Sequence, residues 1–226
     1  RYSPTTIKAT TPTAMTYWTF TDASIQTLPV GTLYCIGRNY ADHAAEMGAP
    51  LPDAGTVADP IVFLKPPTAY RPTGSSVTLP SFSTEIHHEV ELVVVMGVDG
   101  IAGIGVGLDL TARDLQAAAK AKGLPWATAK SWRGSAPVSP IVPWDLAGGG
   151  PWQLTLHING EVRQQASTAL MERSIDQLVA YVDDVFGLQP GDAMFTGTPA
   201  GVAAVRAGDW GLASLDDLCT LEVRFE

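Results

Sequence analysis

The segment from Ile86 to Gly97 constrains the fold more than any other part of the chain. Its second half is a run of β-branched and apolar residues that ends at a glycine, which predicts a buried strand. Its first half carries Glu89 and Glu91, and residues two positions apart on a strand share one face. Such a pair of carboxylates either lines a solvated sheet face or holds a cation. Mg²⁺ or Mn²⁺, which prefer oxygen ligands, would be the simplest cation for this position.

The remaining pattern predicts a β-rich α+β protein. Many short strands alternate with only three convincing helices, which favours a mixed, largely antiparallel architecture over a doubly wound one. A chain of 226 residues can bury one substantial core, so we expect residues 16–226 to form a single domain. Residues 1–15 are rich in Thr, Pro and Ser, and we expect a flexible N-terminal arm or the remnant of a leader there.

The charge balance excludes several classes of protein. Lys plus Arg is 14 and Asp plus Glu is 23, which gives a net charge of −9. An acidic chain without a basic cluster is a poor partner for nucleic acid or for an anionic membrane, and no apolar run is long enough to span a bilayer. Cys35 and Cys219 form no C-x-x-C motif, so neither a disulfide framework nor a zinc site is expected. We therefore expect a reduced compartment, either the cytoplasm or, if the arm is a leader remnant, the mitochondrial matrix.

Residues 41–48 predict a short helix that ends at a glycine. On it His43 and Glu46 are three positions apart, so they share one face and can hydrogen-bond. A carboxylate beside an imidazole fixes the tautomer and raises the basicity, which is how a general base is built. An exposed polar pair without a catalytic role explains the same spacing equally well.

Further polar residues follow apolar segments. Asp109 ends a strand predicted over residues 98–108 and could be a third oxygen ligand, because Thr111 is the better N-cap for the helix that follows. Lys130 is a single cation among small and apolar residues, either on the surface or facing an anion. The Gly/Thr-rich loop 196–201 can offer N–H groups and hydroxyls to an anion, or it can be a plain turn.

Two local signals predict structure rather than chemistry. Asn159-Gly160 between alternating segments predicts a β-hairpin. Ser174 and Gln177 predict a capping box at the start of an amphipathic helix that ends at Gly187.

Six motifs occur in a fixed order along the chain, and together they resemble the fumarylacetoacetate hydrolase family from about Leu33 to the C-terminus. The branch that they resemble most is that of the acylpyruvate and fumarylpyruvate hydrolases. This resemblance implies a mixed β-sandwich or β-roll with a few peripheral helices, usually as a homodimer. The motifs are Gly37-Arg38-Asn39-Tyr40-Ala41-Asp42-His43, His87-His88-Glu89-Val90-Glu91, Leu108-Asp109-Leu110-Thr111-Ala112-Arg113-Asp114, Gly123-Leu124-Pro125-Trp126, Lys130-Ser131 and Thr196-Gly197-Thr198-Pro199.

The resemblance also implies a role for each matching residue. The metal ligands for Mg²⁺ or Mn²⁺ would be Glu89, Glu91 and Asp109. The dyad on a mobile lid helix would be His43 and Glu46, and the lysine beside the bound oxoacid would be Lys130. The polar residues that contact the substrate would be Arg38, Arg113, Gln116 and Thr198, with Thr196 as the alternative to Thr198.

The activity implied is hydrolytic C–C cleavage of a 2,4-diketo acid, such as an acylpyruvate or fumarylpyruvate of aromatic catabolism, to pyruvate and a carboxylic acid. His43, oriented by Glu46, would activate water, and Lys130 would offset developing negative charge. The same metal site could instead decarboxylate oxaloacetate or isomerise a 2-oxo diacid, and a non-catalytic domain that binds a dicarboxylate is a further alternative. The acyl group would be selected by the loop 49–60 and residues near Tyr70 and Arg71; Arg71 either meets a second carboxylate or is a surface residue.

One departure from the family pattern concerns the segment between Gly97 and Gly107. Family members carry a longer connection with a short helix there, whereas this chain has little more than Val98-Asp99-Gly100. Because the expected metal ligands flank this segment, we expect its shortness to alter local packing and not the site.

Overall fold

The described strands form three sheets, of which two contain both parallel and antiparallel pairs and the third is antiparallel. The computed structural model describes residues 15–22, 27–46 and 59–226. The largest sheet has the order β2-β1-β13-β6-β7-β9-β3, with β10 paired to β7. Its strands are β1 (Leu33–Gly37), β2 (Ile61–Lys65), β3 (Tyr70–Pro72), β6 (Val90–Gly97), β7 (Gly100–Leu108), β9 (Ala136–Val138), β10 (Val142–Pro143) and β13 (Ala193–Phe195).

The second sheet has five strands in the order β12-β11-β15-β16-β4, and a third has the order β14-β5-β8. The five-stranded sheet contains β4 (Ser75–Val77), β11 (Gln153–Ile158), β12 (Glu161–Ser167), β15 (Trp210–Leu215) and β16 (Cys219–Phe225). The small sheet contains β5 (Ile86–His88), β8 (Thr111–Ala112) and β14 (Ala203–Val205).

Strand β6 lies between β13 and β7 in the large sheet and supplies side chains to both of its faces. Leu92 and Val94 join the cluster that the five-stranded sheet covers, whereas Val93 and Val95 join a second cluster on the opposite face. All four side chains are fully buried. The two-residue period of a strand explains this division, and burial on both faces explains why this part of the sequence is a continuous apolar run.

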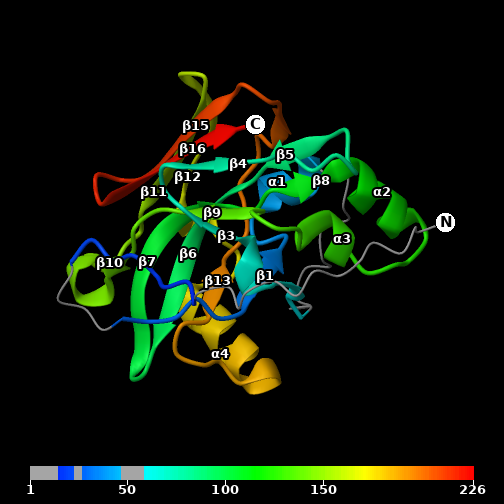
Figure 1. Cartoon of the computed structure of the whole chain (residues 1–226). Helices are drawn as coiled ribbons and strands as arrows, with labels where there is room; N and C mark the ends of the chain where they lie inside the picture. The colour runs from blue at the N-terminus through cyan, green and yellow to red at the C-terminus, as the bar shows by residue number, and fades with distance from the viewer. Residues whose placement is uncertain (1–14, 23–26, 47–58) are drawn as a thin grey trace.

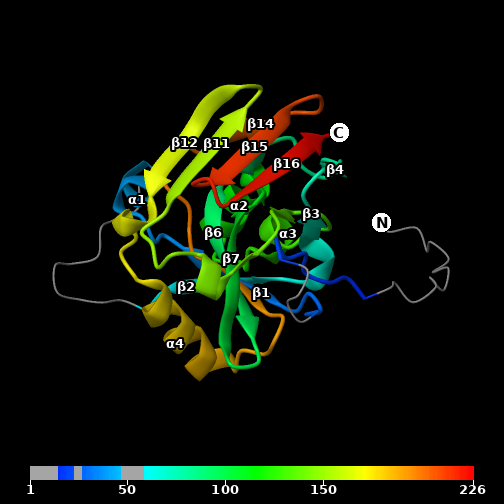
Figure 2. The same cartoon turned by 90° about the vertical axis from the view of Figure 1, so that its left-hand side faces the viewer.

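Four helices surround the sheets in the described part of the chain: α1 (Ala41–Glu46), α2 (Arg113–Ala121), α3 (Ala127–Lys130) and α4 (Ile175–Phe186). Figure 1 shows α2 and α3 side by side next to β5 and β8. Helix α4 packs at the end of the molecule away from the five-stranded sheet (Figure 2). The predicted β-rich sandwich with a few peripheral helices is therefore confirmed. No helix in the described ranges is long and apolar enough to cross a membrane.

Several local predictions are confirmed. Asn159 and Gly160 both have positive φ angles at the turn between β11 and β12, as the Asn-Gly pair predicts. Ser174 and Gln177 form the reciprocal capping box of α4, and Gly187 ends the helix in the left-handed conformation.

The predicted N-cap at Thr111 is wrong. Thr111 lies in β8, and its hydroxyl donates to the backbone carbonyl of Asp109 at 3.1 Å. Helix α2 begins at Arg113, and the N-cap position is Ala112, which makes no side-chain cap. Pairing of His87 with Thr111 between β5 and β8 outweighs the local capping preference, because sheet pairing satisfies the backbone of this residue.

The connection between Gly97 and Gly107 is a tight hairpin. Strands β6 and β7 pair along their length, from Val90 with Leu108 to Gly97 with Gly100, with a turn at Val98 and Asp99. The short connection is therefore a two-residue turn between paired strands.

Candidate metal and catalytic site

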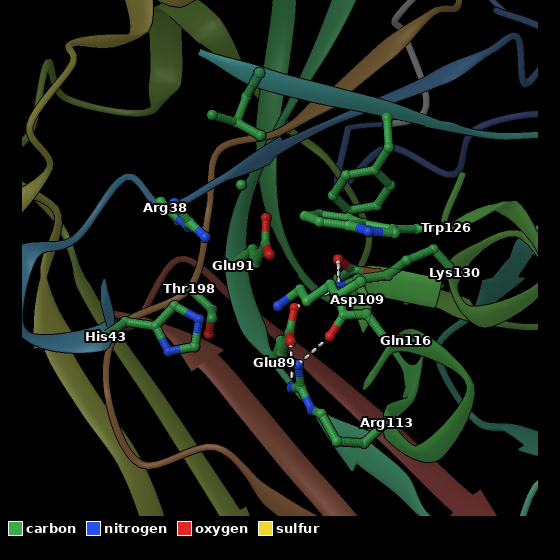
Figure 3. A pocket seen from close by; sticks show the side chains of 14 residues that line it. Arg38, His43, Glu89, Glu91, Asp109, Arg113, Gln116, Trp126, Lys130 and Thr198 are labelled. Atoms are coloured by element: carbon green, nitrogen blue, oxygen red, sulfur yellow. Dashed lines mark hydrogen bonds and ion pairs between the residues drawn. The ribbon is translucent and has the colours of Figure 1, made fainter. Parts of the chain in front are cut away.

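One pocket gathers most of the residues that the sequence analysis selected. It lies where the ends of β1, β6 and β7 meet α1, α2 and α3, and Figure 3 shows the side chains that face it. His43 is part of the pocket wall. Glu46 is not, but it contacts His43. The expected residues that line the pocket are Arg38, His43, Glu89, Glu91, Asp109, Arg113, Gln116, Lys130 and Thr198.

The three carboxylates converge, although the single strand predicted to carry two of them is broken. Glu89 lies between β5 and β6, and only Glu91 belongs to β6. The backbone carbonyl of Glu89 accepts a hydrogen bond from the Asp109 N–H at 2.8 Å, which brings the two segments together. One ligand atom from each of the three carboxylates lies within 4.8 Å of the others, and all three residues are buried.

Lys130 pairs with both Glu89 and Asp109, and Arg113 pairs with Glu89. The Lys130 ammonium lies 2.7 Å from Glu89 Oε2 and 2.6 Å from Asp109 Oδ2, and the Arg113 guanidinium lies 2.5 Å from Glu89 Oε1. Arg113 also donates to the Gln116 side-chain oxygen at 2.6 Å, one turn along α2. The lysine is therefore fully engaged with carboxylates, as an electrostatic role requires.

Glu91 is held differently. Its Oε2 accepts the Gly197 N–H at 2.7 Å. Gly197 has a φ of 99°, and an added Cβ would lie 2.8 Å from Asn39 Cβ, so this position requires glycine. Burial, together with the charges of Asp109 and Glu89, raises the pKa of Glu91 well above its usual range. Without a further cation, this carboxyl group therefore favours its protonated form.

Lys65 is a buried cation beside the site that the sequence analysis missed. It ends β2 and is fully buried, with its ammonium 2.8 Å from Asp109 Oδ1. It also donates to the Leu110 carbonyl, the Lys130 carbonyl and both oxygens of Ser135. The two prolines after Lys65 indicate only that the strand ends there. The one signal for burial is that Lys65 follows the apolar run directly, with no turn residue between them.

The donor set fits a hard divalent cation. Asp109 Oδ1 is buried and accepts no hydrogen bond from any described residue, although the Lys65 ammonium is close to it. Three convergent carboxylates, of which Glu91 has a disfavoured negative charge, are the kind of ligands that Mg²⁺ and Mn²⁺ prefer. The three residues could therefore hold such an ion.

Burial and charge oppose each other at Glu89 and Lys130. Burial alone would raise the pKa of Glu89, but the charges of Lys130 and Arg113 lower it well below its usual range. Burial alone would lower the pKa of Lys130, but Asp109 and Glu89 raise it. Both groups are therefore charged at neutral pH, so Lys130 is a fixed cation and cannot act as a neutral amine.

His43 faces the carboxylates from the side opposite Lys130 (Figure 3). Its Nδ1 lies 3.4 Å from Glu46 Oε2, a long hydrogen bond, and Glu46 also accepts the Gly201 N–H. Burial lowers the pKa of His43, and the charges of Glu89 and Glu46 only partly oppose this. The imidazole is therefore neutral at pH 7 and has a lone pair that can accept a proton.

Thr198, and not Thr196, lies in the pocket wall. The Thr198 hydroxyl donates to the Val90 carbonyl at 2.8 Å and accepts from the Gln164 side-chain amide at 2.8 Å. The Thr196 hydroxyl donates to the Leu92 carbonyl and is fully buried. With its proton already donated to Val90, Thr198 offers the pocket an acceptor lone pair rather than a donor.

The expected acyl-group selectors lie elsewhere or outside the described residues. Arg71 lines a separate pocket with Tyr70 and Arg133, so its expected contact with a second carboxylate has no support in the geometry. Most of the loop 49–60 falls outside the described part of the chain. Pocket residues that sequence analysis did not select include Phe63, Lys120 and Trp126. Lys120 could have been found, because Arg113, Gln116 and Lys120 have the spacing of one helix face.

The residues of this site fall into two groups, the pocket floor and the pocket mouth. The pocket floor is the buried charged cluster of Lys65, Glu89, Glu91, Asp109 and Lys130. The pocket mouth is the set of Arg38, His43, Lys120 and, behind His43, Glu46; His43 is buried and the other three residues are exposed.

Comparison with known proteins agrees with this geometry. Residues 32–226 match the family described as fumarylacetoacetate (FAA) hydrolase C-terminal. Oxaloacetate tautomerase FAHD1, mitochondrial, of Rattus norvegicus is 41% identical over 86% of this chain and 91% of its own length. Oxaloacetate tautomerase YcgM of Escherichia coli is 41% identical over 80% of this chain and 86% of its own length.

A solved structure of a related enzyme has a similar fold. Fumarylpyruvate hydrolase from Pseudomonas aeruginosa in complex with Mn²⁺ and pyruvate superposes with a TM-score of 0.87 at 37% identity, covering 96% of this chain and 98% of that one. The match spans the segments that carry the carboxylates, the dyad and the lysine. The chain therefore belongs to the fumarylacetoacetate hydrolase family.

Proposed function

We propose that the protein is a tautomerase that interconverts the enol and keto forms of a short 2-oxo diacid of the oxaloacetate type. The observation that carries this proposal is the neutral imidazole of His43 opposite a cluster of three carboxylates and a fixed lysine. The names of the relatives from rat and Escherichia coli support the choice of substrate class. Tautomerisation needs one proton acceptor at carbon and no activated water, so it makes the smallest demand on this site.

The floor would hold Mg²⁺ or Mn²⁺ through Glu89, Glu91 and Asp109. A divalent cation bound there would polarise the 2-oxo group and favour negative charge on its oxygen. Lys130, already protonated and fixed by two carboxylates, would support the same charge. Arg113 and Gln116 would orient the adjacent carboxylate.

His43 would be the residue of this chain that accepts and donates the transferred proton. In the keto-to-enol direction the imidazole would take a proton from C3, and the 2-oxo oxygen would gain one from solvent or a neighbouring donor. In the reverse direction the imidazolium would return the proton to C3, and the enol hydroxyl would lose its own. Glu46 would stabilise the imidazolium through its contact with Nδ1.

The test follows the enol form directly. Oxaloacetate freshly dissolved in its enol form is mixed with protein and Mn²⁺, and the decay of the enol ultraviolet absorbance is compared with the spontaneous rate. We expect acceleration that disappears on chelation. A decay rate equal to the spontaneous one, with Mn²⁺ shown to be bound, would refute the proposal.

Hydrolysis of an acylpyruvate or fumarylpyruvate is the second candidate. The likeness to the Pseudomonas aeruginosa fumarylpyruvate hydrolase and the histidine–carboxylate dyad favour it. Here His43 would take a proton from water that adds to the distal carbonyl. Acetate formed with pyruvate from acetylpyruvate, or fumarate with pyruvate from fumarylpyruvate, would establish this activity. Pyruvate and CO₂ from oxaloacetate would indicate decarboxylation instead.

A further inference from the structure

The inner face of α2 carries a row of polar side chains that leads from the pocket floor to its mouth. Arg113, Gln116 and Lys120 are spaced three and four positions apart, and all three line the pocket. Arg113 is neutralised by Glu89, and Gln116 accepts a hydrogen bond from Arg113. Lys120, at the outer end of this row, has no carboxylate within ion-pair distance among the described residues.

The amine of Lys120 is held in place by an aromatic ring. Its Nζ lies 5.0 Å from the centre of the Trp126 ring, which itself forms part of the pocket wall. A cation over a tryptophan face is attracted electrostatically, but the ring does not neutralise its charge. Partial burial, together with the charges of Arg113 and Arg38, lowers the pKa of Lys120, so these cations lie close enough to repel one another.

Arg38 brings a second uncompensated cation to the same mouth. It lines the pocket, and no described acidic residue forms an ion pair with it. Its φ is 62°, in the left-handed region that a side chain such as arginine rarely adopts. Arg38 follows β1 directly and precedes α1, so this backbone conformation turns the chain at the pocket. Strained residues of this kind concentrate at ligand sites.

From this arrangement we propose that Arg38 and Lys120 form a carboxylate subsite at the pocket mouth, which selects 2-oxo diacids over 2-oxo monoacids. The floor would take the 2-oxo carboxylate end of the ligand, and the two cations would take the distal carboxylate. Every cation of the floor is already paired with a carboxylate, whereas these two have no such partner among the described residues. The subsite rests on the proposed function for its first carboxylate and adds the residues that would recognise the second one.

The test compares oxaloacetate with its 4-methyl ester, which has the same shape near the 2-oxo group but no distal charge. Binding to the Mn²⁺-loaded protein is measured by calorimetry, and enol decay is measured alongside it. We expect the wild type to bind the diacid about 10-fold more tightly than the ester, the size of one charge-assisted contact at a partly exposed site.

Three variants make the test specific. Lys120→Met should remove most of the preference for the diacid, and Lys120→Arg should retain it. Lys122→Met is the matched control, because Lys122 is exposed at the end of the same helix and does not line the pocket. It should keep the wild-type preference. If Lys120→Met fails to fold, Arg38→Met provides the same test, because it removes the other cation of the proposed subsite.

The outcomes separate the subsite from the proposed reaction. A preference for the diacid that Lys120→Met removes supports the subsite even if no enol decay is accelerated, in which case only the tautomerase proposal fails. Equal affinity of the wild type for both ligands would overturn the subsite. So would equal losses of affinity for the diacid and the ester in Lys120→Met.

Discussion

The pocket floor and the pocket mouth are held in place in different ways. The floor carboxylates are buried, and each is fixed by a lysine, an arginine or a backbone N–H at 2.5 to 2.8 Å. The mouth has one long contact of 3.4 Å between His43 and Glu46, and its two cations have no described ion pair. The floor is therefore part of the folded core, whereas the mouth is completed by its ligand. Changes in the floor should alter stability and metal binding, and changes in the mouth should alter turnover and ligand choice.

The largest expected effect comes from the mouth. His43→Ala removes the proposed proton acceptor, and we expect turnover to fall by about 10²- to 10⁴-fold, the usual contribution of general base catalysis. Mn²⁺ affinity, measured by calorimetry, should stay at the wild-type value because His43 is not among the carboxylate donors. Lost metal binding in this variant would show that mouth and floor are not separate.

The second-largest expected effect comes from a substitution in the pocket floor. Lys65→Met removes one of the two buried lysines that pair with Asp109, and it removes the donor to the Leu110 carbonyl. Breaking a buried ion pair from one side costs about 3 to 5 kcal/mol of unfolding free energy, measured by urea denaturation. Lys122→Met, which replaces an exposed lysine, should change this free energy by less than about 0.5 kcal/mol. Equal stability of the two variants would contradict the assignment of Lys65 to the floor.

Addition of metal should act on the floor alone. At a free Mn²⁺ concentration 100 times its Kd, the unfolding free energy should rise by about 2.7 kcal/mol. Glu91→Gln should shrink this gain because it removes one donor. The same variant should be no less stable than the wild type without metal, because burial and nearby carboxylates already disfavour the Glu91 charge. A large loss of stability in metal-free Glu91→Gln would mean that its charge is needed by the fold.

The smallest effect concerns pH. Burial lowers the pKa of His43, so the imidazole stays neutral as pH falls through its ordinary value, and kcat/KM for the keto-to-enol direction, in which His43 accepts a proton, should decline only below about 6.5. Glu46 raises this pKa through its charge and hydrogen bond, so Glu46→Gln should lower it further and move the acid limb to lower pH. An acid limb that stays at the wild-type pH would show that Glu46 does not contact the base.

The sequence predicted the donors of the site better than the local structure that places them. Glu89, Glu91 and Asp109 were found because acids are conspicuous next to apolar strands. The break of the strand at Glu89 could not be found, because β5 pairs with β8 and β14, which lie far away in the sequence. Thr111 fails as an N-cap for the same reason.

The positions of other side chains at the site depend on contacts between residues that are far apart in the sequence. Lys65 is buried because Asp109, Leu110 and Ser135 surround its amine, and none of them is near it in the sequence. Gln164 reaches Thr198 and the Val90 N–H from the five-stranded sheet. The roles of the individual site residues, the single-domain organisation and the homodimer stay predictions.

The hairpin that joins β6 to β7 also bears on the order of folding. It carries Glu91 on one strand and leads to Asp109 at the end of the other, and its ends are close in sequence. Hairpins form within about 1 to 10 μs, long before distant segments meet. Lys65 and Lys130 come from β2 and α3, outside this hairpin, so we expect the acids to meet one another before their lysine partners arrive. We then expect repulsion between the acids to slow folding, and a divalent cation to increase the rate of folding as well as the stability of the folded state.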